Sequence, residues 1–283
     1  MGIPMAGRLL HAGYAVFGYD PNDEAARSAR DAGLVTLPTL GEVVERADAV
    51  IVSVPDPDAV ETVFLSAGGV LERARAGAVA VDVSTSTPAL ARRLAELGAQ
   101  RGIAVLDAPV SGGPIRAADG TLVVMVGGPK PAVRQMHPAL SAFGEVVHVG
   151  AAGCGQATKL CNNVLAGVHM AALSESLALA AREGLDPQQL FAVLSRGTGD
   201  SAVLRNRFPA EGVVPTAPAN DGFKARFPVA LMRKDLLLAL ETAATHDLEM
   251  PLVREAAERY AEAGDRGWDD RDYSIIDRLG PGR

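Results

Sequence analysis

The sequence predicts an α/β fold in which a doubly wound parallel sheet is followed by an all-α domain. Through the first 150 residues, short apolar runs alternate with amphipathic stretches, which is the pattern of repeated strand–helix units. Two runs, 49–54 and 78–83, are apolar without alternation, as expected for strands covered on both faces. Strand patterns stop after Gly150, so we expect domains over residues 1–151 and 152–283.

The elements of the first domain follow from these runs in order. Strands are predicted at residues 15–20, 34–37, 49–54, 78–84, 103–108, 121–127 and 146–150. Helices are predicted where apolar residues recur with helical spacing, at residues 4–12, 23–32, 40–47, 58–65 and 88–101. In such a sheet, ligands bind beyond the carboxyl ends of the strands.

The second domain is predicted to contain only helices. The first of them is long and ends at Gly184, and Asp186 with Pro187 begins the next. The segment 197–227 is rich in Gly, Pro and Asn and too long for an ordinary connector, so we expect a functional loop. Helices are predicted at residues 155–182, 188–196, 228–245, 251–263 and 272–278.

Composition limits the classes of function. The chain has 283 residues, 48% hydrophobic and 22% charged, which excludes a disordered or fibrous protein. The net charge of −7 has no block of like charge, so the basic surface of a nucleic-acid or anionic-membrane binder is missing. No apolar stretch is long enough for a membrane span, and the start lacks the pattern of a signal peptide. We expect a soluble, cytoplasmic protein with small-molecule ligands.

The cysteines and lysines are both few. Cys154 and Cys161 fall on one predicted helix, and we expect two buried thiols with no disulfide framework or metal site. Of the 27 basic residues, four are lysines, among them Lys159 and Lys234. Because an ammonium can change its protonation and a guanidinium cannot, a specific role is worth testing at these positions.

The first residues carry half of a dinucleotide-binding fingerprint. In the complete fingerprint, a strand precedes G-x-G-x-x-G and an acidic residue about 20 positions further on holds the ribose. Here Gly2 stands at the last glycine and Asp20 ends the next strand. An aspartate accepts from a ribose 2′-hydroxyl and repels a 2′-phosphate, which favours NAD over NADP. A helix-packing glycine and a solvated aspartate are the alternative.

This half-fingerprint predicts a Rossmann-type sheet that lacks its first strand. That strand is central in the order 3-2-1-4-5-6, so its neighbours would face an empty slot and the chain would be unstable alone. We interpret the gap as a start site assigned too far downstream. The alternative is an impaired or non-catalytic homologue that acts in assembly or ligand sensing.

Polar and glycine-rich loops follow the later strands. Val54 and Pro55 follow one strand and Thr85 follows the next, although Thr85 also fits an ordinary helix N-cap. The run Ser111-Gly112-Gly113 offers successive backbone N–H groups suited to a carboxylate, or it forms a plain turn.

Two lysines lie in apolar surroundings. Lys159 and Asn163 are four residues apart, hence on one helical face, and the apolar flanks argue against an ordinary surface lysine. Lys234 lies in an apolar helix, from which its stem could extend to solvent.

Together these segments resemble one known family. DAPVSGG, with Ala117 and Gly120 after it, and GCGQATKLCNN are similar to the substrate-binding and catalytic signatures of the β-hydroxyacid dehydrogenases, near 3-hydroxyisobutyrate dehydrogenase and tartronate semialdehyde reductase. The resemblance covers essentially the whole chain. It implies hydride transfer between NAD, or NADP, and a small 3-hydroxy acid or its semialdehyde. Tartronate semialdehyde, glyoxylate and succinic semialdehyde are the alternative substrates.

The resemblance also implies roles for single residues. Lys159 is the catalytic lysine and Asn163 its helical companion. The substrate carboxylate is held by Ser111, Gly112 and Gly113, and the cofactor by Val54, Pro55, Thr85 and Lys234. Gly2 and Asp20 are added to the cofactor site by the half-fingerprint described above. The long helices of the second domain pack between subunits, which implies a homodimer or homotetramer.

Overall fold

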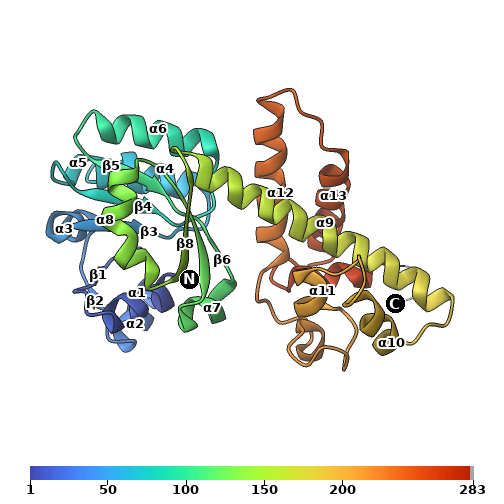
Figure 1. Cartoon of the computed structure of the whole chain (residues 1–283). Coiled ribbons are helices and arrows are strands. Elements are labelled where there is room, and N and C mark those ends of the chain that lie inside the picture. The colour runs from blue at the N-terminus through green and yellow to red at the C-terminus, as the bar shows by residue number, and fades with distance from the viewer. Residues whose placement is uncertain (281–283) are drawn as a thin grey trace. The chain divides into compact units, whose positions relative to one another are not determined.

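The computed structural model describes residues 1–280 and contains two compact units, Met1–Lys159 and Leu160–Arg283. The first unit holds all the strands of the described chain, and the second is helical (Figure 1). The predicted class, a Rossmann-type α/β domain followed by an all-α domain, is therefore confirmed.

The larger sheet of the first unit is built mainly from parallel strands. Strands β3 (Ala49–Val52), β4 (Val79–Asp82) and β5 (Ala104–Asp107) are parallel neighbours. Strand β7 (Leu122–Gly127) runs antiparallel to both β5 and β6 (Val110–Ser111), and β8 (Gly144–Gly150) pairs in parallel with β7. The pairs Asp107↔Gly127 and Val110↔Val124 share one register, so β5 and β6 form a single interrupted line along β7.

A second, smaller sheet stands apart from the first. Strands β1 (Phe17–Gly18) and β2 (Val35–Thr36) pair in parallel with each other. Within residues 1–280, neither pairs with β3 or any other strand of the larger sheet. In the order 3-2-1-4-5-6, β1 and β3 would be the neighbours of the first strand.

Helices cover both faces of the larger sheet. One apolar cluster packs Phe64 and Leu94 against Val105, and the other packs Met136 and Leu140 against Leu106. Since successive residues of β5 join opposite clusters, the sheet is buried on both sides, as its apolar runs predicted. The helices of this unit are α1 (Gly2–His11), α2 (Asp23–Asp31), α3 (Leu40–Arg46), α4 (Pro57–Leu65), α5 (Val70–Arg73), α6 (Pro88–Ala99), α7 (Gly113–Asp119) and α8 (Lys130–Ser141).

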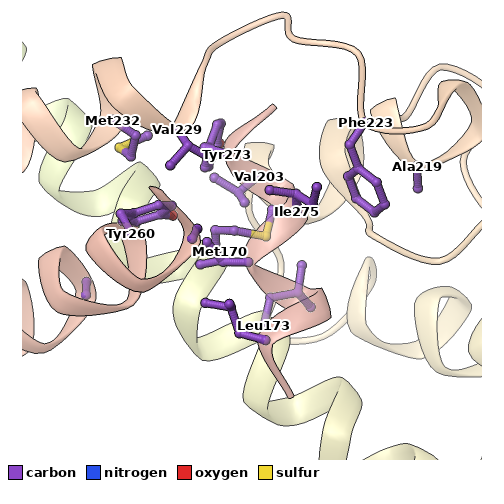
Figure 2. Packing of buried hydrophobic residues seen from close by; sticks show 14 of the residues in the cluster. Met170, Leu173, Val203, Ala219, Phe223, Val229, Met232, Tyr260, Tyr273 and Ile275 are labelled. Atoms are coloured by element: carbon purple, nitrogen blue, oxygen red, sulfur yellow. The ribbon is translucent and has the colours of Figure 1, made fainter. Parts of the chain in front are cut away.

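The second unit packs its helices around one apolar core. Figure 2 shows Met170 near Tyr260 within this cluster. The Tyr260 hydroxyl donates to the Gly167 carbonyl over 3.2 Å, which satisfies the polar end of a fully buried ring. The elements are α9 (Cys154–Arg182), α10 (Pro187–Leu194), α11 (Ala202–Arg207), η1 (Pro218–Asp221), α12 (Val229–Ala244), α13 (Pro251–Asp265) and η2 (Tyr273–Leu279). The expected loop at 197–227 thus contains two short helices, α11 and η1.

A buried carboxylate organises the end of this unit. Asp272 has no exposed surface, and its Oδ2 lies 2.8 Å from Arg207 Nη1. The same oxygen accepts from the backbone N–H groups of Arg226 and Phe227, both at 3.1 Å. Its other oxygen accepts from the Ser274 hydroxyl at 2.7 Å. One side chain therefore joins three segments that are distant in sequence.

Helix α9 differs from expectation in two respects. By length and composition it could cross a membrane, because its best 18-residue window has a mean hydropathy of 1.5. The expectation that no stretch is long and apolar enough is wrong on this criterion, although core helices meet the same test and 33% of the window is buried. Cys161 is exposed and Cys154 is half-buried, so the expectation that both thiols are buried is also wrong. Neither cysteine forms a disulfide.

Candidate active site

The loops after β3 and β4 are joined by a hydrogen bond. The Val54 N–H donates to Ser84 Oγ over 2.9 Å, and the Ser84 N–H donates to Asp82 Oδ1 over 2.9 Å. Thr85 is half-buried between two buried serines, whereas Pro55 is exposed. The structure thus brings the Val54 loop beside the Thr85 loop at the carboxyl ends of adjacent parallel strands, where α/β sheets bind ligands.

Two of the expected cofactor residues lie elsewhere in the first unit. Asp20 is exposed just beyond β1, and its Oδ1 accepts from the Asn22 N–H over 2.9 Å. A fixed, exposed carboxylate is a suitable acceptor for ribose hydroxyls. Gly2 begins α1, and a Cβ atom there would meet nothing within 4 Å, so packing does not require this glycine.

The two glycines after Ser111 are required by the conformation of the backbone. Gly112 has φ +140° and Gly113 has φ +74°, conformations that side chains rarely adopt. A Cβ on Gly112 would also lie 2.9 Å from Arg116 Cβ and from Leu122 Cδ2. Helix α7 begins here without a side-chain cap, so its first N–H groups can serve an external carboxylate.

Asp107, at the end of β5, caps the start of helix α9. Its Oδ1 accepts from the Gly153 N–H over 2.8 Å, and its Oδ2 accepts from the Gln156 N–H over 2.9 Å. A carboxylate is favourable at a helix N-terminus because the first N–H groups are unpaired and the dipole is positive there. Asp107 therefore fixes the first turn of α9 to the sheet.

The side chain of Gln156 forms a second attachment. Its Oε1 accepts from the Ser86 N–H over 2.9 Å, while its Nε2 donates to the Ser84 carbonyl at 3.0 Å and to Asp82 Oδ2 at 3.4 Å. Gln156 and Ser86 have no exposed surface, and Asp82 is 3% exposed. The amide thus joins α9 to both ends of the segment that contains Thr85.

Burial perturbs both carboxyls of this network. Desolvation raises the pKa of Asp82 to about 6, against hydrogen bonds from Ser84 and Ser86 that lower it, and the neighbouring Asp107 raises it further. Desolvation likewise raises the pKa of Asp107, although the N–H groups of Gly153 and Gln156 lower it. The two side chains are register partners on β4 and β5, so their charges oppose each other.

Lys159 and Asn163 follow on the same helix. Lys159 is 6% exposed and lies one turn after Gln156, which places both on one face of α9. In the second unit, Asn163 Nδ2 donates to Asp235 Oδ2, and Asp235 Oδ1 lies 3.1 Å from Lys234 Nζ. The structure therefore links Asn163 to Lys234 through a buried aspartate that the sequence did not suggest.

Known families match both units. A family model described as the NAD binding domain of 6-phosphogluconate dehydrogenase matches residues 1–153. One described as NAD-binding of NADP-dependent 3-hydroxyisobutyrate dehydrogenase matches residues 153–279. The probable 3-hydroxyisobutyrate dehydrogenase of Mycobacterium tuberculosis is 40% identical over 278 residues, which cover 98% of this chain and 93% of the relative. The chain belongs to the 3-hydroxyisobutyrate dehydrogenase family.

A solved structure and one further relative resemble this dehydrogenase along nearly its whole length. The solved structure of the M. tuberculosis enzyme with L-serine has a TM-score of 0.92 at 39% identity, and the match covers 99% of this chain and 95% of that one. The NAD-dependent L-serine dehydrogenase of Pseudomonas aeruginosa is 36% identical over 280 residues, or 99% of this chain and 94% of the relative. The resemblance expected from the two sequence signatures is confirmed, and the protein is an NAD(P)-dependent hydroxy acid dehydrogenase.

The residues of the dehydrogenase fit this cofactor. The exposed carboxylate of Asp20 matches the hydroxyl donors of a ribose, and the Val54 and Thr85 loops lie at the sheet edge that binds nucleotides in such folds. Within residues 1–280, no group of three or more His, Cys, Asp or Glu side chains could hold a metal ion.

Proposed function

We propose that this dehydrogenase reversibly oxidises 3-hydroxyisobutyrate, or a 3-hydroxy acid of similar size, to its semialdehyde, with NAD as the preferred cofactor. Support for the substrate comes from relatives named for it at 38% to 40% identity. The observation that carries the chemistry is Lys159, a buried lysine on a helix whose first turn is fixed to the sheet.

In this proposal Lys159 handles the proton of the reacting oxygen. During oxidation its neutral amine accepts the hydroxyl proton at Nζ, and during reduction its ammonium donates to the carbonyl oxygen, where negative charge develops. Bound NAD(P) supplies the hydride acceptor or donor. Because the cofactor takes up only the hydride, the hydroxyl proton needs a separate acceptor, and the proposal assigns this role to Lys159.

The remaining residues bind and orient. We assign the substrate carboxylate to Ser111 and the N–H groups at Gly112 and Gly113, with Asn163 as the companion of Lys159. Cofactor contacts are assigned to Gly2, Asp20, Val54, Pro55, Thr85 and Lys234. The charge of Lys234 is paired with Asp235, so its proposed role is a hydrogen bond rather than a free positive charge.

The experiment is a comparison of Lys159→Ala with wild type in steady-state turnover and in NADH titration. We expect turnover to fall by roughly 100-fold to 10,000-fold, since proton transfer is lost, with NADH affinity retained. Lys130→Ala, which removes an exposed lysine of α8, is the matched control. Near-normal turnover in Lys159→Ala would refute the assignment.

A second substrate is L-serine, which is itself a 3-hydroxy acid. It is favoured by the P. aeruginosa relative named as an L-serine dehydrogenase. Initial rates with 3-hydroxyisobutyrate, L-serine, glycerate, glyoxylate, and tartronate and succinic semialdehydes, each with NAD(H) and NADP(H), decide between the candidate substrates.

We further propose that the protein is cytoplasmic and forms a homodimer or homotetramer. Light scattering of the purified protein tests the oligomeric state.

A further inference from the structure

The Gln156 side chain makes three hydrogen bonds within the first unit and has no part in the proposed chemistry. We propose that it is a positioning residue: its amide holds the first turn of α9, and with it Lys159, in register with the loop that carries Thr85. This inference rests on the proposed roles of Lys159 and Thr85.

An amide is the group that this position requires. Oε1 must accept from the Ser86 N–H while Nε2 donates to the Ser84 carbonyl and to Asp82. A glutamate has the same shape, but when ionised it has no donor for the Ser84 carbonyl. It would also add a third carboxylate beside Asp82 and Asp107. The hydrogen-bond pattern therefore distinguishes Gln from its closest isostere.

The turn that Gln156 occupies is held against the sheet by other contacts as well. A Cβ on Gly155 would lie 2.5 Å from the carbonyl oxygens of Asp107 and Met125, so only glycine allows this approach. Asp107 also accepts from the Gln156 N–H in this turn and from the Gly153 N–H just before α9. Helix α9 thus stays docked on β5 and β7 when the Gln156 amide is removed, and what is lost is the link to the loop after β4.

The link matters because both of its ends lead to residues of the proposed site. Thr85 is flanked by Ser84 and Ser86, and both of these bond to the same amide. Lys159 lies three residues after Gln156 on the same helical face. A shift of about 1 Å between groups that must meet one substrate costs about 100-fold in rate. Loss of the amide is therefore expected to lower kcat without unfolding the unit.

The test uses Gln156→Leu and Gln156→Glu in the full chain. For Gln156→Leu, kcat is expected to fall by about 10-fold to 100-fold, within the cost of a small misalignment. For Gln156→Glu, the ratio of its kcat to that of wild type is expected to rise as the pH falls from 8 to 5.5, because a protonated glutamic acid regains a donor. A side chain with only a packing role would give no such pH dependence.

Hydrogen exchange of the free protein adds a readout independent of turnover. The Ser86 amide loses its acceptor in Gln156→Leu, and we expect its exchange to become at least about 10-fold faster. The control is Met136→Ala, which weakens the apolar core of the same unit away from the amide. At an equal loss of thermal stability, Met136→Ala is expected to keep its kcat.

Three results would overturn the inference. They are a wild-type kcat in Gln156→Leu, a loss of kcat no greater than that of a stability-matched Met136→Ala, and a kcat ratio for Gln156→Glu that does not change with pH. If Gln156→Leu does not fold, the pH dependence of kcat in the isosteric Gln156→Glu still tests the positioning role. Normal turnover in Lys159→Ala would instead refute the proposed function, so the two failures are distinguishable.

Discussion

Asp82 makes the stability of the first unit depend on pH in an unusual direction. Most buried carboxylates are paired with cations, and they stabilise a fold as the pH rises. Asp82 instead lies beside Asp107 with hydrogen bonds from Ser84 and Gln156, and burial raises its pKa from 3.8 to about 6. Ionisation of Asp82 therefore opposes folding.

The sign and the magnitude follow from proton linkage. Between pH 4 and pH 6 the folded chain keeps a proton on Asp82 that the unfolded chain has released, so the free energy of unfolding falls as the pH rises. The stabilisation is fully present below the unfolded pKa of 3.8 and is lost as the pH passes about 6. At about 1.4 kcal/mol for each pH unit, the displacement corresponds to roughly 3 kcal/mol.

The perturbation is Asp82→Asn, which keeps an oxygen for the Ser84 N–H and removes the titration. The assay is urea unfolding followed by circular dichroism from pH 4 to pH 7.5, and the quantity is the stability of wild type minus that of the variant. We expect this difference to fall by roughly 3 kcal/mol across the range. Asp119→Asn controls for the loss of one carboxylate at an exposed position. Parallel curves for wild type and Asp82→Asn would refute the reasoning.

Three further predictions concern the ligand sites and the second unit. Asp20→Asn should raise the kcat/KM with NADP relative to that with NAD, since the carboxylate no longer repels a 2′-phosphate; an unchanged ratio would contradict the cofactor assignment. Ser111→Ala should raise the KM for the hydroxy acid in initial-rate assays, and an unchanged KM would remove Ser111 from the site. Asp272→Ala leaves Arg207 and several N–H groups unpaired, so urea unfolding should show a loss of about 3–5 kcal/mol, against little change for the exposed Asp270→Ala.

The elements that the sequence predicted well have a local cause. Strands β3 and β4 are short apolar runs because both faces of the sheet are covered, and α9 ends before Gly184, whose φ is +71°. Helix α8 was missed because Pro131 and Pro138 interrupt a pattern that tertiary packing of Met136 restores. Strand β6 and helices α5 and α7 were missed because they are too short to show a period.

In the candidate site, too, the residues in local sequence motifs could be predicted and the long-range contacts could not. Lys159 and Ser111 could be proposed because each lies in a contiguous motif whose local spacing carries the signal. The pairing of Gln156 with Ser86 joins residues 70 positions apart, and that of Asp107 with Gly153 joins residues 46 apart. Such partnerships depend on how strands and helices pack, and a single sequence does not encode them as a local pattern. The only local sign was that Gln156 shares a helical face with Lys159.

The separation of β1 and β2 from the larger sheet has a consequence for native-state opening. Helix α2 has no buried residue, and Leu34 is the one buried apolar side chain between residues 17 and 36. Segments with so little apolar burial open locally at a small fraction of the global free energy. Amide protons there should exchange long before those of β4. A ligand that reaches Asp20 would then be detected first as slowed exchange in this segment.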